Sequence, residues 1–391
     1  MKVLHVASGK TGGAYRAGKR LYDIQAESGI NVHFLTNHDR NTLKQIASRL
    51  YTLHSRLVTR PKFGLMSIYS LNGLSSKKIR EINPDVIHIH NWFNLLSISQ
   101  IQKLSKDFPI IFTMHDERLL TGGCHNHLDC GEFKKGCRTC PAIRLPISKS
   151  VIKARTESEQ LINGNNITIT TPSKWLQRET EAFNLGKALP VVLPNPLSNA
   201  FYDYSEAIEA KKPNDVQQLL FIAANPWIPL KGLDRLIKAL IDIERKGVHK
   251  FNLSIVGNTN PSIKVPHFVK LVGAMEDTDL VREIRRSDLV FVPSYSENLP
   301  SVVLESQYLG LVVVATNVGG IPEMISDMNT GLLQRDGESF PDLVRRALDL
   351  PLEQRQFIRS HASTFAKKHV SKESIVDLSM RIYKEALNDY K

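Results

Sequence analysis

The sequence lacks any apolar run long enough to cross a membrane. No window reaches the roughly 18 to 20 uncharged apolar residues that a membrane-spanning helix needs. The N-terminus, MKVLHVASG, begins directly with a strand pattern instead of a signal-peptide core. Low-complexity segments are also missing. Together with 42% hydrophobic and 23% charged residues, these absences are typical of a globular protein, and we expect a cytoplasmic location.

Cysteine is scarce and confined to one stretch. Cys124, Cys130, Cys137 and Cys140 all lie in TGGCHNHLDCGEFKKGCRTC, and only the last two are spaced as CxxC, which is irregular for a zinc ribbon. Four neighbouring thiols in a cytosolic chain are nevertheless explained more readily by a structural zinc ion than by disulfides. Free thiols and disulfides remain alternatives, and His125 or His127 could replace one ligand.

Acidic residues are missing from a long basic stretch. The net charge is +12, and residues 1–190 hold 27 Lys and Arg against 14 Asp and Glu, whereas residues 191–391 hold 24 against 25. The excess is densest in one segment without any carboxylate, at Arg40, Lys44, Arg49, Arg56, Arg60, Lys62, Lys77, Lys78 and Arg80. A solvated helix face would explain this segment. Because apolar residues such as Leu50 and Leu57 lie among the charges and no nucleic-acid motif is near, we favour an anionic membrane surface.

The pattern along the chain predicts two α/β domains. A chain of 391 residues is long enough for about two domains. Short apolar runs alternate with helical stretches in both halves, and this pattern is typical of a parallel sheet that is covered on both faces. The expected strands are at residues 3–7, 31–36, 85–90, 109–114 and 167–171 in the first half, and at 219–224, 252–258, 269–274, 288–294 and 311–316 in the second.

The joint between the domains is expected at VVLPNPLSN, because two prolines around Asn195 exclude a helix there. We therefore predict an N-terminal domain at 1–193, a C-terminal domain at 194–371 and a terminal helix at 372–391 that could cross back to the first domain. Both domains are expected to be doubly wound. Ligands of such sheets bind beyond the carboxyl ends of the strands.

Two carboxylates flank the start of a predicted helix in SYSENLPSVVLES. Glu297 follows a strand, whereas Glu305 falls on the second turn of a helix whose first positions are expected at Pro300 and Ser301. The amides of Asn298 and Leu299 at this helix start suit a phosphate. Carboxylates beside a phosphate site are tolerated when they accept hydrogen bonds from hydroxyls. A sugar nucleotide has hydroxyls on both its ribose and its transferred sugar, so it fits both glutamates of the motif.

The run PSYSENLPSVVLESQYLGLVVVATNVGGIPEMI resembles the donor-binding signature of retaining glycosyltransferases of family 4. The family pattern is a glutamate, seven residues, a second glutamate and then a Gly-Gly turn. The similarity extends over most of the chain, from TGGAYRAGKRL to TGLLQ. It implies the GT-B architecture, in which two doubly wound parallel-sheet (Rossmann-like) domains face a cleft, the N-terminal one binding the acceptor and the C-terminal one the nucleotide sugar.

The resemblance also implies roles for individual residues. Glu305 would hold the ribose hydroxyls and Glu297 the donor sugar, with Asn298 and Leu299 close to the sugar and diphosphate. Lys231, in PLKGLDRL, matches the family lysine that meets the diphosphate, where a cation offsets the charge of the leaving group. The family arginine about five residues earlier is missing here, because Pro226 takes its place.

The glycines near the N-terminus do not form a P-loop, because GxxxxGK[ST] would require glycine at Leu4. Gly12 and Gly13 instead resemble the Gly-rich loop of the family, where backbone amides approach the diphosphate. Arg16, just beyond this loop, is the candidate to replace the missing arginine.

His115 ends the strand in FTMHDE and matches the family histidine near the reacting sugar, where it would contact a hydroxyl of the donor sugar or the acceptor. Asp116 beside it is a second catalytic candidate. His88 and His90 alternate along an inner strand and are interpreted as mainly structural. Asp277 and Asp279 form an Asp-x-Asp pattern but are expected to precede and cap a helix, so transfer is predicted to need no metal.

The sequence thus predicts a retaining glycosyltransferase that moves a hexose-type sugar from a UDP-, GDP- or ADP-linked donor to an acceptor hydroxyl with an α linkage. The acceptor would be a sugar or a lipid-linked sugar in the synthesis of a surface polysaccharide or a lipid-linked oligosaccharide. A sugar-nucleotide 2-epimerase of the same architecture and a basic nucleic-acid-binding protein are the alternatives. The donor signature argues against both, and no nucleic acid is expected as a partner.

Overall fold

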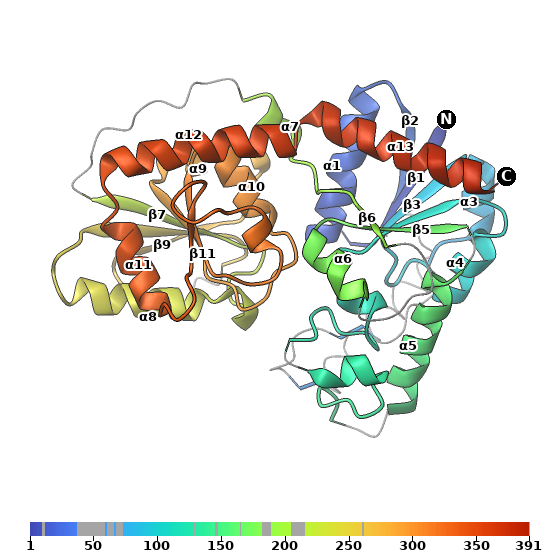
Figure 1. Cartoon of the computed structure of the whole chain (residues 1–391), viewed down its shortest axis with the longest axis horizontal. Coiled ribbons are helices and arrows are strands. Elements are labelled where there is room, and N and C mark those ends of the chain that lie inside the picture. The colour runs from blue at the N-terminus through green and yellow to red at the C-terminus, as the bar shows by residue number, and fades with distance from the viewer. Residues whose placement is uncertain are drawn as a thin grey trace. The chain divides into compact units, whose positions relative to one another are not determined.

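The computed structural model describes residues 1–9, 12–36, 59–60, 66–67, 73–128, 130–144, 148–164, 166–181, 189–204, 216–259 and 262–390. The chain divides into two units (Figure 1). The first comprises Met1–Asn195 together with Ile375–Lys391, and the second comprises Pro196–Ser374. The end of the chain therefore belongs to the same unit as its beginning.

The first unit is built on a parallel sheet with the strand order β2-β1-β3-β4-β5-β6. Its strands are β1 Lys2–Ala7, β2 Asn31–Leu35, β3 Val86–Asn91, β4 Ile110–Thr113, β5 Ile167–Thr171 and β6 Val191–Val192. Its helical segments are α1 Gly13–Glu27, α3 Ser76–Ile82, α4 Ile98–Leu104, η3 Glu117–Leu119, η4 Gly131–Lys135, α5 Ser148–Ile162 and α6 Lys174–Glu181, together with most of α13 Lys372–Tyr390. Serines fix two of the helix starts, because the Ser75 and Ser97 hydroxyls accept hydrogen bonds from backbone amides of α3 and α4.

The second unit repeats this plan with the strand order β12-β11-β10-β7-β8-β9. Its strands are β7 Gln217–Ile222, β8 Phe251–Val256, β9 Val269–Gly273, β10 Leu289–Val292, β11 Val312–Ala315 and β12 Leu332–Leu333. Its helical segments are α7 Asn199–Tyr202, η5 Pro229–Lys231, α8 Leu233–Glu244, α9 Asp277–Arg286, α10 Ser301–Tyr308, η6 Ile321–Glu323, α11 Phe340–Leu348 and α12 Leu352–His369.

Both faces of the second sheet are covered, and β10 shows this clearly. Leu289 and Phe291 pack with α8 and α11 in one apolar cluster, whereas Val290 and Val292 pack with α9 and α10 in another. Successive side chains of a strand point to opposite faces. A strand buried on both faces therefore has to be apolar at every position, which explains the continuous apolar run LVFV.

The predicted fold class is confirmed, because both sheets are parallel and covered by helices. The ten predicted strands are present to within a few residues at their ends. The strands β6 and β12 were not predicted, since each has only two residues at a sheet edge and two residues carry no periodicity.

The strand orders place a topological switch point in each unit. In the second unit the chain leaves β7 toward β8 on one side and reaches β10 on the other, so the loops after β7 and β10 diverge at the carboxyl edge of the sheet. In the first unit the same relation holds for β1 and β3. Open α/β sheets bind ligands at such points.

No helix among the described residues is long and apolar enough to cross a membrane.

Candidate active site

Lys231 and Glu297 meet at the switch point of the second unit. Lys231 ends η5 in the loop after β7, and Glu297 lies in the loop after β10. The Nζ atom of Lys231 lies 2.6 Å from Oε1 of Glu297, and the two side chains are 34% and 12% exposed. The site thus has a cation and a carboxylate that pair with each other and remain partly accessible.

Two glycines bring these loops together. A Cβ atom on Gly232, at φ +69°, would lie 1.8 Å from the carbonyl oxygen of Pro293, and one on Gly319, at φ +58°, would lie 1.6 Å from that of Glu297. A backbone hydrogen bond from the Tyr295 amide to the Leu230 carbonyl holds the first contact in place. Only glycine allows the backbone to approach so closely, and at φ values that L residues rarely adopt. The Gly319-Gly320 turn therefore packs against the backbone of Glu297.

Further polar contacts fix the loop after β10. The Ser294 hydroxyl donates to Oε1 of Glu297 at 2.9 Å, and the Thr316 hydroxyl donates to the Ser294 carbonyl at 2.7 Å. Arg235 donates to the carbonyls of Pro293 at 2.6 Å and Ser294 at 2.5 Å, and its guanidinium lies 3.9 Å from the centre of the Tyr295 ring. Arg235 and Thr316 were missed by the sequence analysis, because nothing in their spacing relates them to Glu297.

Glu305 lies on the second turn of α10, as its spacing predicted, and is 4% exposed. Asn298 and Leu299 precede this helix. Pro300 is not the first helical residue as predicted. It is the N-cap residue with an extended backbone, at φ −68° and ψ 115°, and the helix begins at Ser301. The boundary is shifted by one residue because a proline φ fits both positions.

Pro226, at the position where the resemblance implied an arginine, packs against Gly257. A Cβ atom on Gly257 would lie 2.9 Å from the Pro226 ring and 1.9 Å from the Ala223 carbonyl oxygen. Arg235 is the nearest arginine in sequence after Lys231, but its guanidinium already binds the loop carbonyls described above.

Gly12 and Gly13 of the first unit lie at the start of α1. Gly12, at φ +102°, is the N-cap residue, and a Cβ atom on Gly12 or Gly13 would have no neighbour within 4 Å. Arg16 is exposed on the first turn of this helix. The open space at a helix start fits a ligand that approaches the backbone amides.

His115 and Asp116 follow β4 and have different surroundings. Burial lowers the pKa of His115 to about 4, so its ring is neutral at pH 7. Burial alone would raise the pKa of Asp116, but the Arg118 guanidinium and then His125 hold it well below its usual range. Both carboxylate oxygens of Asp116 contact Nε of Arg118, at 2.8 and 2.9 Å, and Asp116 caps η3. Its observed contacts thus hold the loop after β4.

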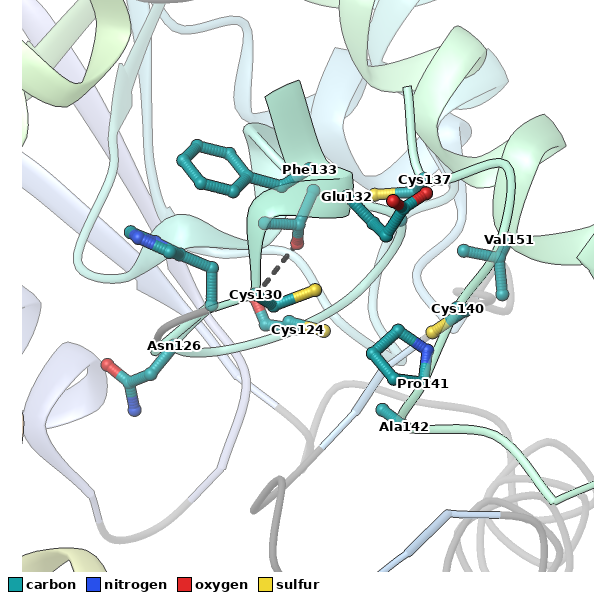
Figure 2. Close-up of a pocket in the computed structure, with 13 residues that line it drawn as sticks. Cys124, Asn126, Cys130, Glu132, Phe133, Cys137, Cys140, Pro141, Ala142 and Val151 are labelled. Carbon is teal, nitrogen blue, oxygen red and sulfur yellow. Dashed lines mark hydrogen bonds between the residues drawn. The ribbon is translucent and has the colours of Figure 1, made fainter. Parts of the chain in front are cut away.

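The four cysteines line one small cavity together with His127 and Glu132 (Figure 2). They form no disulfide. Burial, followed by the other three thiols, raises the pKa of Cys124 well above its usual range. Within the described part of the chain, no three of the sulfur atoms lie within 4.8 Å of one another.

The two histidines considered as substitute ligands differ in how many of their ring nitrogens have partners. Nδ1 of His125 lies 3.3 Å from Asp116 and its Nε2 lies 3.1 Å from the Ser67 hydroxyl. Nδ1 of His127 lies 2.8 Å from Oε2 of Glu117. Both ring nitrogens of His125 are thus engaged, whereas the contact of His127 with Glu117 involves only Nδ1, an arrangement that is common for histidines that bind a metal through the other nitrogen.

Asp277 and Asp279 do not precede a helix as predicted. They lie inside the first turn of α9, and Glu276 is the N-cap residue. Negative charge is favourable in a first helical turn, and neither residue belongs to a metal-ligand cluster found among the described residues.

Most of the basic stretch lies outside the described residues, including Arg40, Lys44, Arg49, Arg56 and Lys62 together with the apolar residues between them. Two of the basic residues that are described face carboxylates. Lys77 lies 3.8 Å from Glu81, and Arg80 lies 2.5 Å from Asp107. These two contribute less positive charge to a surface than their count suggests.

Comparison with known proteins identifies the family. The family model described as Glycosyltransferase Family 4 matches residues 11–199, and the model described as Glycosyl transferases group 1 matches residues 205–364. A D-inositol 3-phosphate glycosyltransferase from Mycobacterium sp. (strain KMS) is 39% identical over 338 residues, which cover 78% of this chain and 68% of that protein. The chain belongs to the family 4 glycosyltransferases.

Solved structures agree with the GT-B fold of this glycosyltransferase. The Anabaena protein HepE, in complex with UDP and glucose, gives a TM-score of 0.62 at 16% identity, with 98% of this chain and 100% of that chain covered. WaaG, a glycosyltransferase involved in lipopolysaccharide biosynthesis, gives a TM-score of 0.62 at 16% identity, with 98% and 99% covered.

The close approach at Gly232 yields a stability prediction for the glycosyltransferase. Gly232→Ala should lower the free energy of unfolding by about 2 to 5 kcal/mol, because a positive φ costs about 1 to 2 kcal/mol and overpacking adds about 1 to 3 kcal/mol. Gly247→Ala is the matched control, since Gly247 has φ +68° but no atom lies within 4 Å of the position that its Cβ would take. Denaturant unfolding measures both, and equal losses would contradict the packing argument.

Proposed function

We propose that this glycosyltransferase moves a sugar from a nucleotide diphosphate sugar to an acceptor hydroxyl with retention of configuration, so that an α linkage is formed. The observation that carries the proposal is the Lys231–Glu297 pair at the switch point of the second unit, 2.6 Å apart and partly exposed. The UDP and glucose bound to HepE and the resemblance to retaining family members support it. Departure of the diphosphate and attack by the acceptor would take place on the same face of the sugar.

The ion pair suggests how the donor engages the site. A diphosphate carries more negative charge than one carboxylate, so it would draw Lys231 away from Glu297 and use the cation to offset the charge of the leaving group. Glu297 would then accept hydrogen bonds from hydroxyls of the transferred sugar. The Ser294 hydroxyl, 2.9 Å from Glu297, would keep the carboxylate in place during this exchange.

The remaining residues of the second unit would act around this pair. Glu305, on α10, would bind the ribose hydroxyls, and the amides of Asn298 and Leu299 at the helix start would meet the diphosphate or the sugar. In the first unit, Gly12, Gly13 and Arg16 would offer backbone amides and a guanidinium to the diphosphate, as the family resemblance implies. His115 would contact a sugar hydroxyl, while Asp116 would support its loop through Arg118.

Two substitutions separate the roles of the two glutamates. Glu305→Gln should weaken binding of free nucleoside diphosphate and raise the donor KM, because the ribose changes little during the reaction. Glu297→Gln should lower kcat but leave nucleoside diphosphate affinity intact or slightly higher, since it removes the carboxylate that competes for Lys231. A hydrogen bond to a charged group contributes about 1.5 to 3 kcal/mol, so each effect should be roughly tenfold to a hundredfold.

Calorimetry with UDP, GDP and ADP and initial rates with the matching donor sugars measure these effects. Glu353→Gln, on an exposed first turn of α12, is the control for loss of one carboxylate. If Glu297→Gln weakens the diphosphate as much as Glu305→Gln does, the assignment of roles is wrong. A product with inverted anomeric configuration by NMR would refute retention, and diphosphate release without any acceptor would point to the epimerase.

We further propose that the cysteine cavity holds one structural zinc ion. All four thiols line it, and backbone amides donate to two sulfurs, from Gly122 to Cys137 and from Ala142 and Ile143 to Cys140. Such hydrogen bonds stabilise a thiolate, which is the form that binds zinc. The sulfur atoms would need to rotate toward one another on binding.

Protein purified without chelator should therefore contain about one zinc ion per chain. Cys140→Ser should lose the metal and unfold at a lower temperature, and a thiol titration should find four reactive groups only after the metal is removed. Elemental analysis that finds no zinc, with four titratable thiols at the outset, would leave the alternative of free thiols.

The acceptor is proposed to be a sugar or a lipid-linked sugar of a surface polysaccharide, which is consistent with the pathway named for WaaG. The basic stretch would then bring the enzyme to an anionic membrane surface. Vesicles containing anionic lipids should sediment the protein at low salt and release it as salt rises, because each basic residue near the surface adds about 1 kcal/mol and is screened by ions. Equal sedimentation with neutral vesicles would contradict this proposal.

A further inference from the structure

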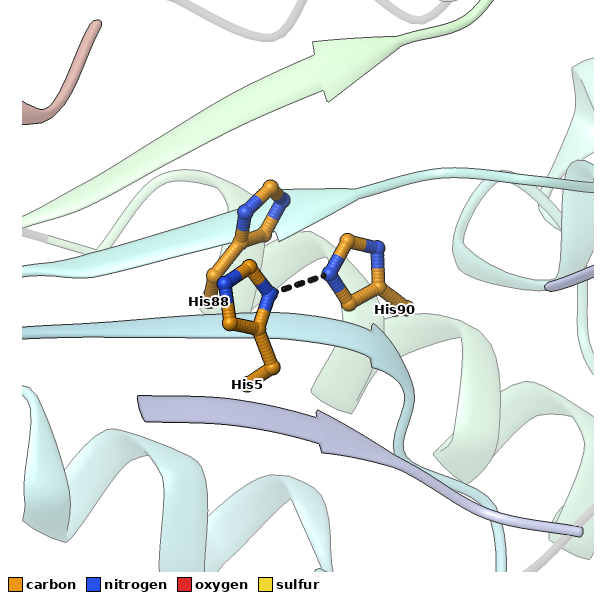
Figure 3. A group of neighbouring side chains, drawn as sticks. All are labelled: His5, His88 and His90. Carbon is orange, nitrogen blue, oxygen red and sulfur yellow. Dashed lines mark hydrogen bonds between the residues drawn. The ribbon is translucent and has the colours of Figure 1, made fainter. Parts of the chain in front are cut away.

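Three histidines form a buried cluster in the first unit. His5 extends from β1, and His88 and His90 extend from the same face of the neighbouring strand β3 (Figure 3). Their side chains are between 0% and 3% exposed, and one nitrogen from each lies within 4.8 Å of the others. Such spacing suits either a metal ion or a set of hydrogen bonds.

The hydrogen-bond partners favour the second interpretation. Nε2 of His5 lies 2.9 Å from Oε1 of Gln25, and its Nδ1 lies 3.0 Å from Nε2 of His90. Nδ1 of His88 lies 2.7 Å from the Tyr383 hydroxyl, and its Nε2 lies 2.7 Å from the Thr113 hydroxyl. A metal would have to displace several of these short bonds without any new partner for the groups released.

A backbone carbonyl of α13 sets the direction of these bonds. The Ser379 hydroxyl donates to the Val376 carbonyl at 2.8 Å, so its oxygen acts as an acceptor toward Gln25. The Gln25 amide nitrogen, 2.8 Å away, must therefore be the end that faces Ser379. The same nitrogen donates to the Tyr383 hydroxyl at 3.1 Å, which leaves the Gln25 oxygen directed at His5.

The same reasoning then fixes the proton positions of three neutral rings, those of His5, His90 and His115. Burial lowers the pKa of His5 to about 4 and that of His90 well below its usual value, so each ring carries one proton. His5 must carry it on Nε2 to donate to Gln25, so its Nδ1 accepts from Nε2 of His90. Nδ1 of His90 accepts in turn from Nε2 of His115, at 3.5 Å, the longest bond of the series. His115 is thus left with its proton on Nε2.

Close packing holds the middle of this series in place. Gly18 of α1 lies so near that a Cβ atom there would be 2.7 Å from the His90 ring. The rings of His5 and His90 are stacked, with centres 5.3 Å apart. His90 therefore has little freedom to turn away from His115.

We propose that Gln25, His5 and His90 are positioning residues that hold His115 as the neutral Nε2–H tautomer, with Nδ1 as the nitrogen that accepts a hydrogen bond from a sugar hydroxyl. The role of the hydroxyl rests on the function proposed above, whereas the tautomer rests only on the contacts within the first unit. The Val376 carbonyl of α13 fixes which atom donates in the first bond of the series, that of Ser379, and each later bond follows from it. Helix α13 therefore takes part in setting the proton position at His115.

Long-range ¹H–¹⁵N NMR spectra of protein with ¹⁵N-labelled histidine identify the tautomers directly. We expect the Nε2–H form for His115 at pH 7, with its signal assigned by its loss in His115→Gln. Gln25→Met removes the acceptor that fixes His5 and should give a mixture of both tautomers at His115. Thr170→Val is the matched control. The buried Thr170 hydroxyl bonds to Thr113, which bonds to His88, and it is not part of the series that connects Gln25 with His115.

Kinetics and metal analysis complete the test. Gln25→Met should lower kcat by about twofold to tenfold, as expected for one neutral hydrogen bond, without changing nucleoside diphosphate affinity, whereas Thr170→Val should leave kcat unchanged. The proposal would be overturned if wild-type His115 carried its proton on Nδ1, or if the His115 tautomer were unchanged in Gln25→Met. It would also be overturned if a zinc ion were lost in His5→Phe but kept in Cys140→Ser. Absence of sugar transfer from any donor would refute the proposed function and leave the tautomer result standing.

Discussion

The close approach of two loops at the end of β10 is the contact on which the candidate site depends. Gly232 and Gly319 both pack against the backbone between Pro293 and Glu297, at distances that exclude any Cβ atom. Because a parallel sheet places the carboxyl ends of its strands along one edge, loops after β7, β10 and β11 meet there. The glycines allow those loops to touch, and the Lys231–Glu297 pair is the result.

Arg235 also holds the loop after β10 in place. Its guanidinium binds two carbonyls of the loop after β10 and stacks on Tyr295, so a cation close to the proposed phosphate site is used for structure. Arg235 is therefore not available to take the place of the arginine that the resemblance implied before Lys231. Pro226 stands at the position where the resemblance implied that arginine.

The first unit depends on a buried polar network in place of a purely apolar core. Gln25 and His88 both bond to Tyr383 of α13, and Gln25 is separated from its two partners on that helix by 354 and 358 positions in the sequence. A buried polar group without a partner costs about 1 to 3 kcal/mol, so these bonds specify how α13 lies on the sheet. They also give the histidines of β1 and β3 fixed proton positions.

The sequence by itself determined the two parallel sheets, the position of Glu297 in a loop and the position of Glu305 on the second turn of α10. These features follow from local periodicity and spacing, which act within a few residues. Only the tertiary structure decided that Lys231 pairs with Glu297, that Asp116 is held by Arg118, and that His5, His90 and His115 share a series of hydrogen bonds. Each of these contacts depends on strand order, loop conformation and close backbone approach, none of which local sequence encodes.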